Sequence, residues 1–258
     1  MNYSAKNFMF KFSIFIVLLY LLPACEKEKS PVSVFYGTEQ PMGDGTIKSF
    51  IETDETGAPV SLGVTFTDAA LQNLPTGFEF GYSYTLDLPV EVKIPPYNHI
   101  SCDWNEHGHP PMGVYNVPHF DFHNYFISLD ERAAIKAEDS LQFANHPLDK
   151  YIPEHYEAEE GGIPNMGGHF VDVTSGEFND QKFDYTFIFG NYDAQVIFIE
   201  PMITLEVFKS KKDVSIPITQ PKAWQKSGYY PQNYHFYYDT EKDSHIVVME
   251  NMVWHDAQ

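Results

Sequence analysis

Six consecutive residues constrain the fold of this chain more than any other part of the sequence. They read Pro118-His119-Phe120-Asp121-Phe122-His123, so polar residues that can bind metals alternate with aromatic ones. Successive side chains of a β-strand point to opposite faces, and this two-residue period therefore predicts a strand with one apolar and one polar face. The proline at the start and the alternation both argue against a helix. We expect the apolar face of this strand to lie in the protein core.

The composition favours a β fold for the rest of the chain as well. Aromatic residues make up 16% of the 258 residues, with 17 Tyr and 21 Phe, and such side chains suit a pleated, half-buried surface. Runs of strand-forming residues around turn residues predict a strand over 82–92 and three hairpins. The hairpins pair 49–53 with 60–66, 183–189 with 195–205, and 234–238 with 245–253. We therefore predict a mainly β domain, an antiparallel sandwich or an open barrel.

One main helix and two long loops complete the predicted fold. Ser128 is followed three residues later by Glu131, which is a capping-box pattern, and an alanine-containing segment continues to about residue 145. Prolines punctuate the first predicted loop, 95–118, and glycines and acidic residues fill the second, 149–168. Loops of this length within a compact domain are usually functional.

The N-terminal segment predicts a lipoprotein signal peptide. Lys6 and Lys11 accompany an apolar run, 12–22, that is shorter than the roughly 20 residues a membrane-spanning helix needs. The run ends in Leu22-Pro23-Ala24-Cys25, which resembles the bacterial lipobox, whose cysteine is acylated, for example with palmitate, after cleavage. A generic secretory signal and an uncleaved anchor are the alternatives.

These features also predict the organisation and location of the protein. We expect a signal peptide over 1–24, a tether over 25–42 and a single β-rich domain over 43–258. A lipid on Cys25 would anchor the chain to a membrane, so we expect an outer-membrane lipoprotein of the bacterial cell envelope, on its periplasmic or surface face. With Cys25 acylated, Cys102 would be the one remaining thiol. We expect Cys102 to be buried and inert.

The charge balance excludes one class of partner. The chain carries 16 Lys+Arg against 36 Asp+Glu, a formal net charge of −20 at pH 7. A field of this sign repels the phosphates of nucleic acids, so we expect no nucleic-acid binding. Composition alone identifies no protein or small-molecule partner.

The polar face of the strand at 118–123 is the candidate functional site. His119, Asp121 and His123 would share that face, with neighbouring positions about 6.6 Å apart along the strand. One metal ion could therefore take His119 with Asp121, or Asp121 with His123, but both histidines only if the strand is bulged. Further ligands must come from other segments, and we expect all donors to converge on one centre. The candidates are His109 in the first loop, His169 at the end of the second loop, and Glu200, a carboxylate in an apolar strand that needs a partner.

Three interpretations of this cluster stay open. Imidazole and carboxylate donors suit a divalent transition metal, Zn, Fe, Mn, Ni or Cu. Alternatively the histidines are structural, and the protein is a non-catalytic binding or assembly module at the cell surface that uses Tyr229, Tyr230 and Tyr237. A metal-free pocket with a histidine as general base is the third. No catalytic residue can be named, because the sequence patterns of common hydrolases and phosphate-binding loops are missing, and whether the protein is an enzyme stays open.

Several segments resemble a family of bacterial envelope domains of unknown function. The resemblance lies in Gly63-Val64-Thr65-Phe66 with Ala70-Leu71, Gly108-His109-Pro110-Pro111 with Tyr115, Pro118-His119-Phe120-Asp121-Phe122-His123, Met166-Gly167-Gly168-His169, Glu200-Pro201-Met202-Ile203-Thr204 and Gly228-Tyr229-Tyr230-Pro231. Together these segments run through most of residues 43–253. The chain departs from the family pattern at Asn124, where an aromatic residue is usual, and near Ala194, where a glycine is usual. The resemblance implies an extracytoplasmic β-rich domain and supplies no reaction.

Overall fold

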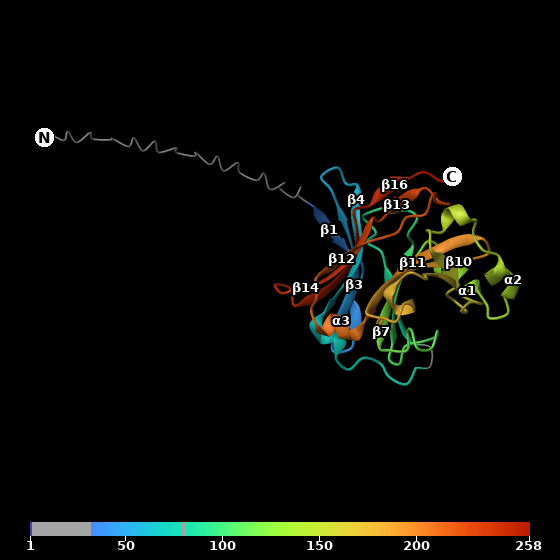
Figure 1. Cartoon of the computed structure of the whole chain (residues 1–258), viewed down its shortest axis with the longest axis horizontal. Helices are drawn as coiled ribbons and strands as arrows, with labels where there is room; N and C mark the ends of the chain where they lie inside the picture. Colours follow the sequence, from blue (N-terminus) through green and yellow to red (C-terminus); the bar gives the residue numbers. More distant parts are fainter. Residues whose placement is uncertain (2–31, 79–80) are drawn as a thin grey trace. The chain divides into compact units, whose positions relative to one another are not determined.

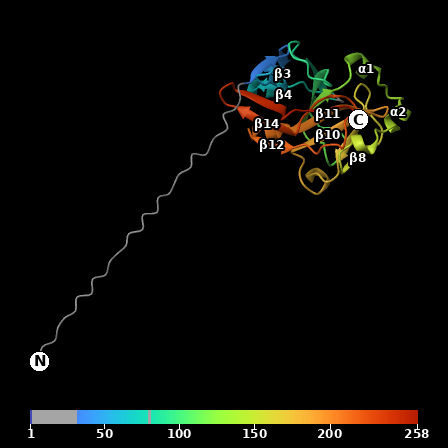
Figure 2. The same ribbon diagram turned by 90° about the horizontal axis from the view of Figure 1, so that it is seen from above.

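The computed structural model describes Met1 and residues 32–78 and 81–258 (Figures 1 and 2). Within these residues, two seven-stranded antiparallel sheets and one two-stranded sheet form the folded domain. Sheet A contains, in spatial order, β1 (Ser33–Tyr36), β3 (Gly45–Thr53), β4 (Pro59–Thr67), β15 (Ser244–Glu250), β14 (Asn233–Asp239) and β12 (Val214–Pro217), with β2 (Gln40–Met42) paired to β3. Sheet B contains β5 (Tyr82–Asp87), β6 (His99–Asn105), β7 (His119–Tyr125), β11 (Gln195–Thr204), β10 (Tyr185–Tyr192), β9 (Gly168–Asp172) and β8 (Tyr156–Ala158). The small sheet pairs β13 (Gly228–Tyr230) with β16 (Val253–His255).

The helices of the described residues are short. They are α1 (Leu129–Ala134), α2 (Ser140–Ala144), α3 (Leu205–Lys209) and the 3₁₀ helices η1 (Asp68–Leu71), η2 (Asp149–Tyr151) and η3 (Gly176–Phe178). None of the helices in the described part of the chain has the length and apolar character needed to cross a membrane.

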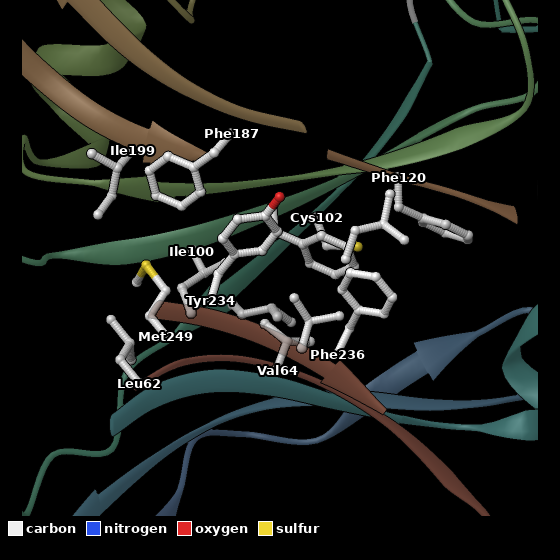
Figure 3. Close-up of a cluster of buried hydrophobic side chains, with 14 of the residues drawn as sticks. Leu62, Val64, Ile100, Cys102, Phe120, Phe187, Ile199, Tyr234, Phe236 and Met249 are labelled. Atoms are coloured by element: carbon white, nitrogen blue, oxygen red, sulfur yellow. The ribbon is translucent and has the colours of Figure 1, made fainter. Parts of the chain in front are cut away.

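Sheets A and B pack face to face over a shared apolar core, and the predicted sandwich is confirmed. Figure 3 shows side chains of both sheets meeting between the layers, with Val64 and Phe236 from sheet A opposite Phe120 and Cys102 from sheet B. Packing two sheets in this way buries one face of each, which explains why apolar residues alternate with polar ones along the strands.

The three predicted hairpins are confirmed as β3–β4, β10–β11 and β14–β15. The alternating segment at residues 118–123 forms β7, in which Phe120 and Phe122 are fully buried in the core between the sheets. β5 is shorter than the predicted strand and ends at Asp87.

The prediction of a continuous loop over 95–118 was wrong, because β6 lies within it. All seven residues of β6 are buried, and the strand pairs with β5 on one side and β7 on the other. Its sequence, His-Ile-Ser-Cys-Asp-Trp-Asn, carries small and polar residues that are untypical of a central strand. Alternation places Ile100, Cys102 and Trp104 in the core, which stabilises the strand by burial. Of the predicted loop, residues 95–98 and 106–118 lie outside the strands.

The predicted main helix was also wrong beyond its first turn. The capping box is present, with Ser128 N donating to Glu131 Oε2 at 2.7 Å and Ser128 Oγ accepting from Glu131 N. The helix ends at Ala134 because Ile135 takes an extended backbone (φ −70°, ψ 120°) that directs its side chain into an apolar cluster. α2 then begins after Asp139, so two short helices replace one.

Part of the expected tether belongs to the folded domain. β1 and β2, which lie within residues 25–42, pair with β3 at the edge of sheet A. The predicted signal peptide and its lipidation site, Cys25, lie outside the described residues.

Candidate metal centre

Sheet B carries a row of polar side chains on the face that points away from sheet A. We call it the buried polar face, and its members are Ser101, Asp103, Asn105, His119, Asp121, His123 and Glu200, each at most 7% exposed. The register of β6 and β7 places Asn105 opposite His119, Asp103 opposite Asp121, and Ser101 opposite His123. Side chains at directly opposite positions have Cβ atoms about 5 Å apart, so these polar groups lie within reach of one another.

Loops and short helices cover this face. α1 and α2 lie beyond sheet B on the side remote from sheet A (Figures 1 and 2), and Ile135 and Phe143 pack on Tyr125 and Phe198 of the sheet. The loop over 106–118 is held down by Tyr115, which is 1% exposed and packs among residues of β9, β10 and β11. The covering segments therefore exclude water from most of the buried polar face.

A turn in the loop over 106–118 places His109 over sheet B. Gly108 has φ +69°, and a Cβ there would lie 2.0 Å from the Tyr115 carbonyl oxygen. Only glycine fits this close approach, which lets His109 N donate to the same carbonyl at 3.3 Å. The turn explains the Gly-His-Pro motif as the element that positions a histidine over β7.

His109, His119 and Asp121 form the first group of candidate ligands, which we call the outer triad. Each offers one ligand atom, and these atoms all lie within 4.8 Å of one another. His119 Nε2 lies 3.1 Å from Asp121 Oδ1, and His109 Nε2 lies 3.4 Å from Asp121 Oδ2. Metal–ligand bonds of 2.0–2.2 Å place two ligands of a tetrahedral ion about 3.3–3.6 Å apart, so both separations are close to this geometry.

Hydrogen bonds determine which ring nitrogen of each outer-triad histidine is free. His119 Nδ1 lies 2.7 Å from the Val117 carbonyl oxygen and His109 Nδ1 lies 2.7 Å from the Pro110 carbonyl oxygen. A carbonyl oxygen only accepts, so each Nδ1 carries the hydrogen and, in the neutral ring, each Nε2 presents a lone pair. Both lone pairs face oxygens of Asp121, which are also acceptors. A cation or a proton is therefore required between them.

His123, His169 and Glu200 form the second group, the inner triad, whose ligand atoms also lie within 4.8 Å of one another. His123 Nε2 lies 3.4 Å from Glu200 Oε2, and His123 Nδ1 lies 3.3 Å from Asp103 Oδ2. A histidine between a carboxylate and a ligand position is the arrangement seen around protein-bound metals, where the outer carboxylate orients the ring. Asp103 is itself held by the hydroxyl of Ser101, which donates at 2.7 Å.

His169 reaches the inner triad because the chain enters β9 very close to β10. Gly167 has φ +129°, and a Cβ there would lie 2.7 Å from the Asn191 carbonyl oxygen. The next residue, Gly168, pairs with Asn191, and His169 pairs with Gly190. The Met-Gly-Gly-His motif is thus explained by a close backbone approach that places the imidazole over sheet B.

The outer triad carries charge in the metal-free protein. Burial opposes the charged form of His109, but the nearby carboxylate of Asp121 outweighs it and raises the pKa of His109 to about 9. Burial likewise raises the pKa of Asp121, but the nearby imidazoles of His119 and His109 lower it well below its usual value. The carboxylate is therefore ionised and paired with a protonated His109.

The inner triad is uncharged when metal-free. Burial lowers the pKa of both His123 and His169 to about 3. Burial, and then the charges of Asp121, Asp103 and Glu159, raise the pKa of Glu200 well above its ordinary value. Neutral imidazoles are ready to coordinate a metal, whereas Glu200 would release its proton on binding.

Several buried nitrogen and oxygen atoms of the two triads have no hydrogen-bond partner. His119 Nε2, Asp121 Oδ1, His123 Nδ1 and Glu200 Oε2 are buried and make no hydrogen bond to the described residues. Among these residues, the ion pairs that reach Asp103, Asp121 and Glu200 come from histidines and not from lysine or arginine. Burying unpaired polar and charged groups is costly, and either a bound cation or a proton at these atoms would offset that cost.

All six residues proposed from the sequence as ligands lie in this region, but in two groups instead of one. The predicted convergence on a single centre was wrong, because His119 and His123 lie at opposite ends of an unbulged stretch of β7 and belong to different triads. Cys102 is buried as expected and faces the core on the other side of sheet B, where burial raises its pKa well above the usual value. Tyr230, expected at a partner surface, is 1% exposed.

The sequence interpretation missed three residues that complete the site. Asn105 Nδ2 donates to Asp121 Oδ2 at 2.7 Å, Asp103 supports His123, and Glu159 Oε2 lies 3.7 Å from His169 Nδ1. Asp103 and Asn105 lie in the segment mistaken for a loop. Glu159 lies in a run of acidic residues that looks like an ordinary solvated surface, and nothing in its spacing distinguishes it.

Comparison with known proteins gives one partial match. A family model described as TTHB210-like, hypothetical protein TTHB210, matches residues 54–104. The chain is similar to this family from the turn after β3 to Trp104 in β6, a span that includes Asp103 but none of the six candidate ligands. The match supports the coarser part of the resemblance, to a family without an assigned activity. No curated protein and no solved structure matches the chain.

Proposed function

We propose that this protein binds divalent transition-metal ions, one in each triad. The observation that carries the proposal is the convergence of ligand atoms in the outer triad, where Nε2 of His109 and Nε2 of His119 lie 3.4 and 3.1 Å from the oxygens of Asp121. A metal ion between them would satisfy all three groups at once. In the inner triad the unpartnered Glu200 Oε2 and the Asp103–His123 pair support the same interpretation.

The ligand atoms of both triads suit the metals expected from the sequence. Two imidazoles and one carboxylate per triad suit Zn, Fe, Mn, Ni or Cu, and the buried thiol of Cys102 is not part of either triad. Three protein ligands leave an open position on a four-coordinate ion, as in metal sites that bind water or a substrate. The function proposed here is metal binding, with this open position available to water or a small ligand.

Metal stoichiometry tests the proposal. The domain should bind two equivalents of Zn²⁺ after chelator treatment, measured by elemental analysis following gel filtration. His109→Ala and His169→Ala should each reduce this to one, because each removes the ligand that a covering segment supplies to one triad. His107→Ala is the matched control, since its side chain is 84% exposed in the same loop as His109, and it should retain two.

Two outcomes would contradict the proposal. If the unsubstituted domain binds no Zn²⁺, Fe²⁺, Mn²⁺, Ni²⁺ or Cu²⁺ at stoichiometric amounts, the triads are hydrogen-bonded structural clusters with protons in place of metals. If metal binds but both alanine variants keep two equivalents, it binds somewhere other than the triads.

We also propose that the chain is a lipoprotein of the bacterial cell envelope, anchored to the outer membrane through an acylated Cys25. The proposal is supported by the Leu22-Pro23-Ala24-Cys25 sequence and the apolar run before it. The wild-type chain should incorporate radiolabelled palmitate in a bacterial host and sediment with membranes. Cys25→Ser should do neither, and label retained by Cys25→Ser would contradict the anchor.

A further inference from the structure

A cleft opens beside the inner triad. It has a volume of about 510 Å³, which is within the range of ligand-binding pockets, and it lies between α2 and the segment 158–162. Its lining residues are Ala137, Ser140, Phe143, Ala144, His146, Ala158, Glu159, Glu160, Gly161 and Gly162. The charged side chains of this lining are acidic, and it contains no lysine or arginine.

Glu159 joins the cleft to the inner triad. Its carboxylate lines the cleft with 28% of the side chain exposed, and its Oε2 lies 3.7 Å from Nδ1 of His169. The two residues are also tied through the backbone, because Glu159 N donates to the His169 carbonyl oxygen at 2.8 Å. A group held by Glu159 is therefore next to the imidazole of the triad.

The inner triad needs a path from the solvent, because its side chains are buried. His123 and Glu200 have side chains only 1% and 2% exposed, and even His169 is 13% exposed. A hydrated divalent cation cannot cross the apolar cover of the sheet without losing its water shell at great cost. A partly exposed carboxylate at the edge of the triad can replace part of that shell before the cation moves inward.

We propose that this cleft is the port through which a hydrated divalent cation reaches the inner triad, with Glu159 as its first ligand. The inference rests on the proposed metal binding and adds the route by which the ion enters the inner triad. The negative lining concentrates cations at the cleft mouth, and Glu159 passes the ion to His169, which then shares it with His123 and Glu200. Glu159 acts in transfer and is not a permanent ligand.

The rate of metal uptake tests the port. In a His109→Ala background, which leaves only the inner triad, Co²⁺ is mixed with the metal-free full-length protein and its visible absorption is followed by stopped flow. Glu159→Gln, which keeps the shape of the side chain, should slow uptake by about tenfold or more, the scale of electrostatic steering. It should still bind one equivalent at equilibrium. Glu157→Gln is the control for loss of one charge, because Glu157 is exposed and outside the cleft, and it should load at the parental rate.

A steric variant tests the same route without touching a carboxylate. Ala144 is an exposed lining residue of α2, and Ala144→Trp should fill the cleft and slow Co²⁺ uptake. Leu141→Trp, on the same helix but 82% exposed and outside the lining, is the matched control and should not slow uptake.

The outcomes separate this inference from the proposed function. Uptake at the parental rate in both Glu159→Gln and Ala144→Trp would overturn the port while leaving the metal site intact. Loss of equilibrium binding in Glu159→Gln would also overturn it, because Glu159 would then be a permanent ligand. If the unsubstituted protein binds neither Co²⁺ nor any of the five metals named above, the proposed function falls and the port with it.

Discussion

Replacing His99 by Gln should change how the stability of the protein depends on pH. His99 lies at the start of β6, 3% exposed, with its ring stacked on Tyr125 at a centroid distance of 4.8 Å. Its Nε2 is buried and has no hydrogen-bond partner among the described residues. Burial, with a smaller contribution from the charge of Arg132, lowers the pKa of His99 to about 4 from its ordinary 6.5.

The magnitude follows from proton linkage. In the unfolded chain His99 binds a proton as the pH falls through 6.5, but in the folded protein it stays neutral until about pH 4. Between these values the unfolded state binds more protons, so stability falls as the pH is lowered, by about 1.4 kcal/mol per pH unit. Between pH 7.5 and 5.5, His99 should therefore remove about 1.4 kcal/mol from the free energy of unfolding.

The assay is urea unfolding of the metal-free protein, followed by tryptophan fluorescence in the presence of a chelator at pH 7.5, 6.5 and 5.5. The wild-type protein should lose its stability advantage over His99→Gln by about 1.4 kcal/mol across this range. Taking the difference between the two proteins cancels the titration of the other buried groups. His107→Gln, at an exposed position, should show no such trend.

A constant difference between wild type and His99→Gln from pH 7.5 to 5.5 would refute this reasoning. It would mean that the folded protein protonates His99 as readily as the unfolded chain does. If the stability of the wild type relative to His99→Gln instead increased at low pH, a negatively charged group would have to interact with the His99 ring.

Two other substitutions test the structure around the site. Ser128→Ala should remove the capping box of α1 and cost about 1 kcal/mol, lowering the melting temperature by about 2–4 °C in differential scanning calorimetry; an unchanged melting temperature would mean that α1 contributes little to stability. Gly190→Ala would place a Cβ 2.0 Å from the ring of Phe198, which packs on His123 and His169 at centroid distances of 4.9 and 5.7 Å. We expect the free energy of unfolding, measured with urea, to fall by about 1–3 kcal/mol, and Zn²⁺ to bind more weakly at the inner triad alone. Normal Zn²⁺ affinity at the inner triad would show that Phe198 does not support it.

Local pattern was enough to predict the framework of this protein. The alternation at 118–123 predicted β7 and the face of each side chain, because the strand period is a property of the backbone alone. Turn residues between apolar runs predicted the three hairpins, because such residues mark the turns that join neighbouring strands. Residue chemistry was enough to select the six candidate ligands, since a buried carboxylate such as Glu200 needs a partner wherever it lies.

Tertiary packing decided the features that sequence patterns did not contain. β6 is a strand because it pairs with β5 and β7 and buries its apolar face against sheet A. The helix after Ser128 breaks because Ile135 gains more from the apolar cluster than from another helical turn. The division of the ligands into two triads depends on where His109 and His169 return to the sheet. That position is determined by long-range contacts, such as the approach of Gly167 to Asn191, and no local period encodes them. Glu159 illustrates the same limit, because its sequence neighbours resemble a solvated surface and only folding brings its carboxylate beside His169.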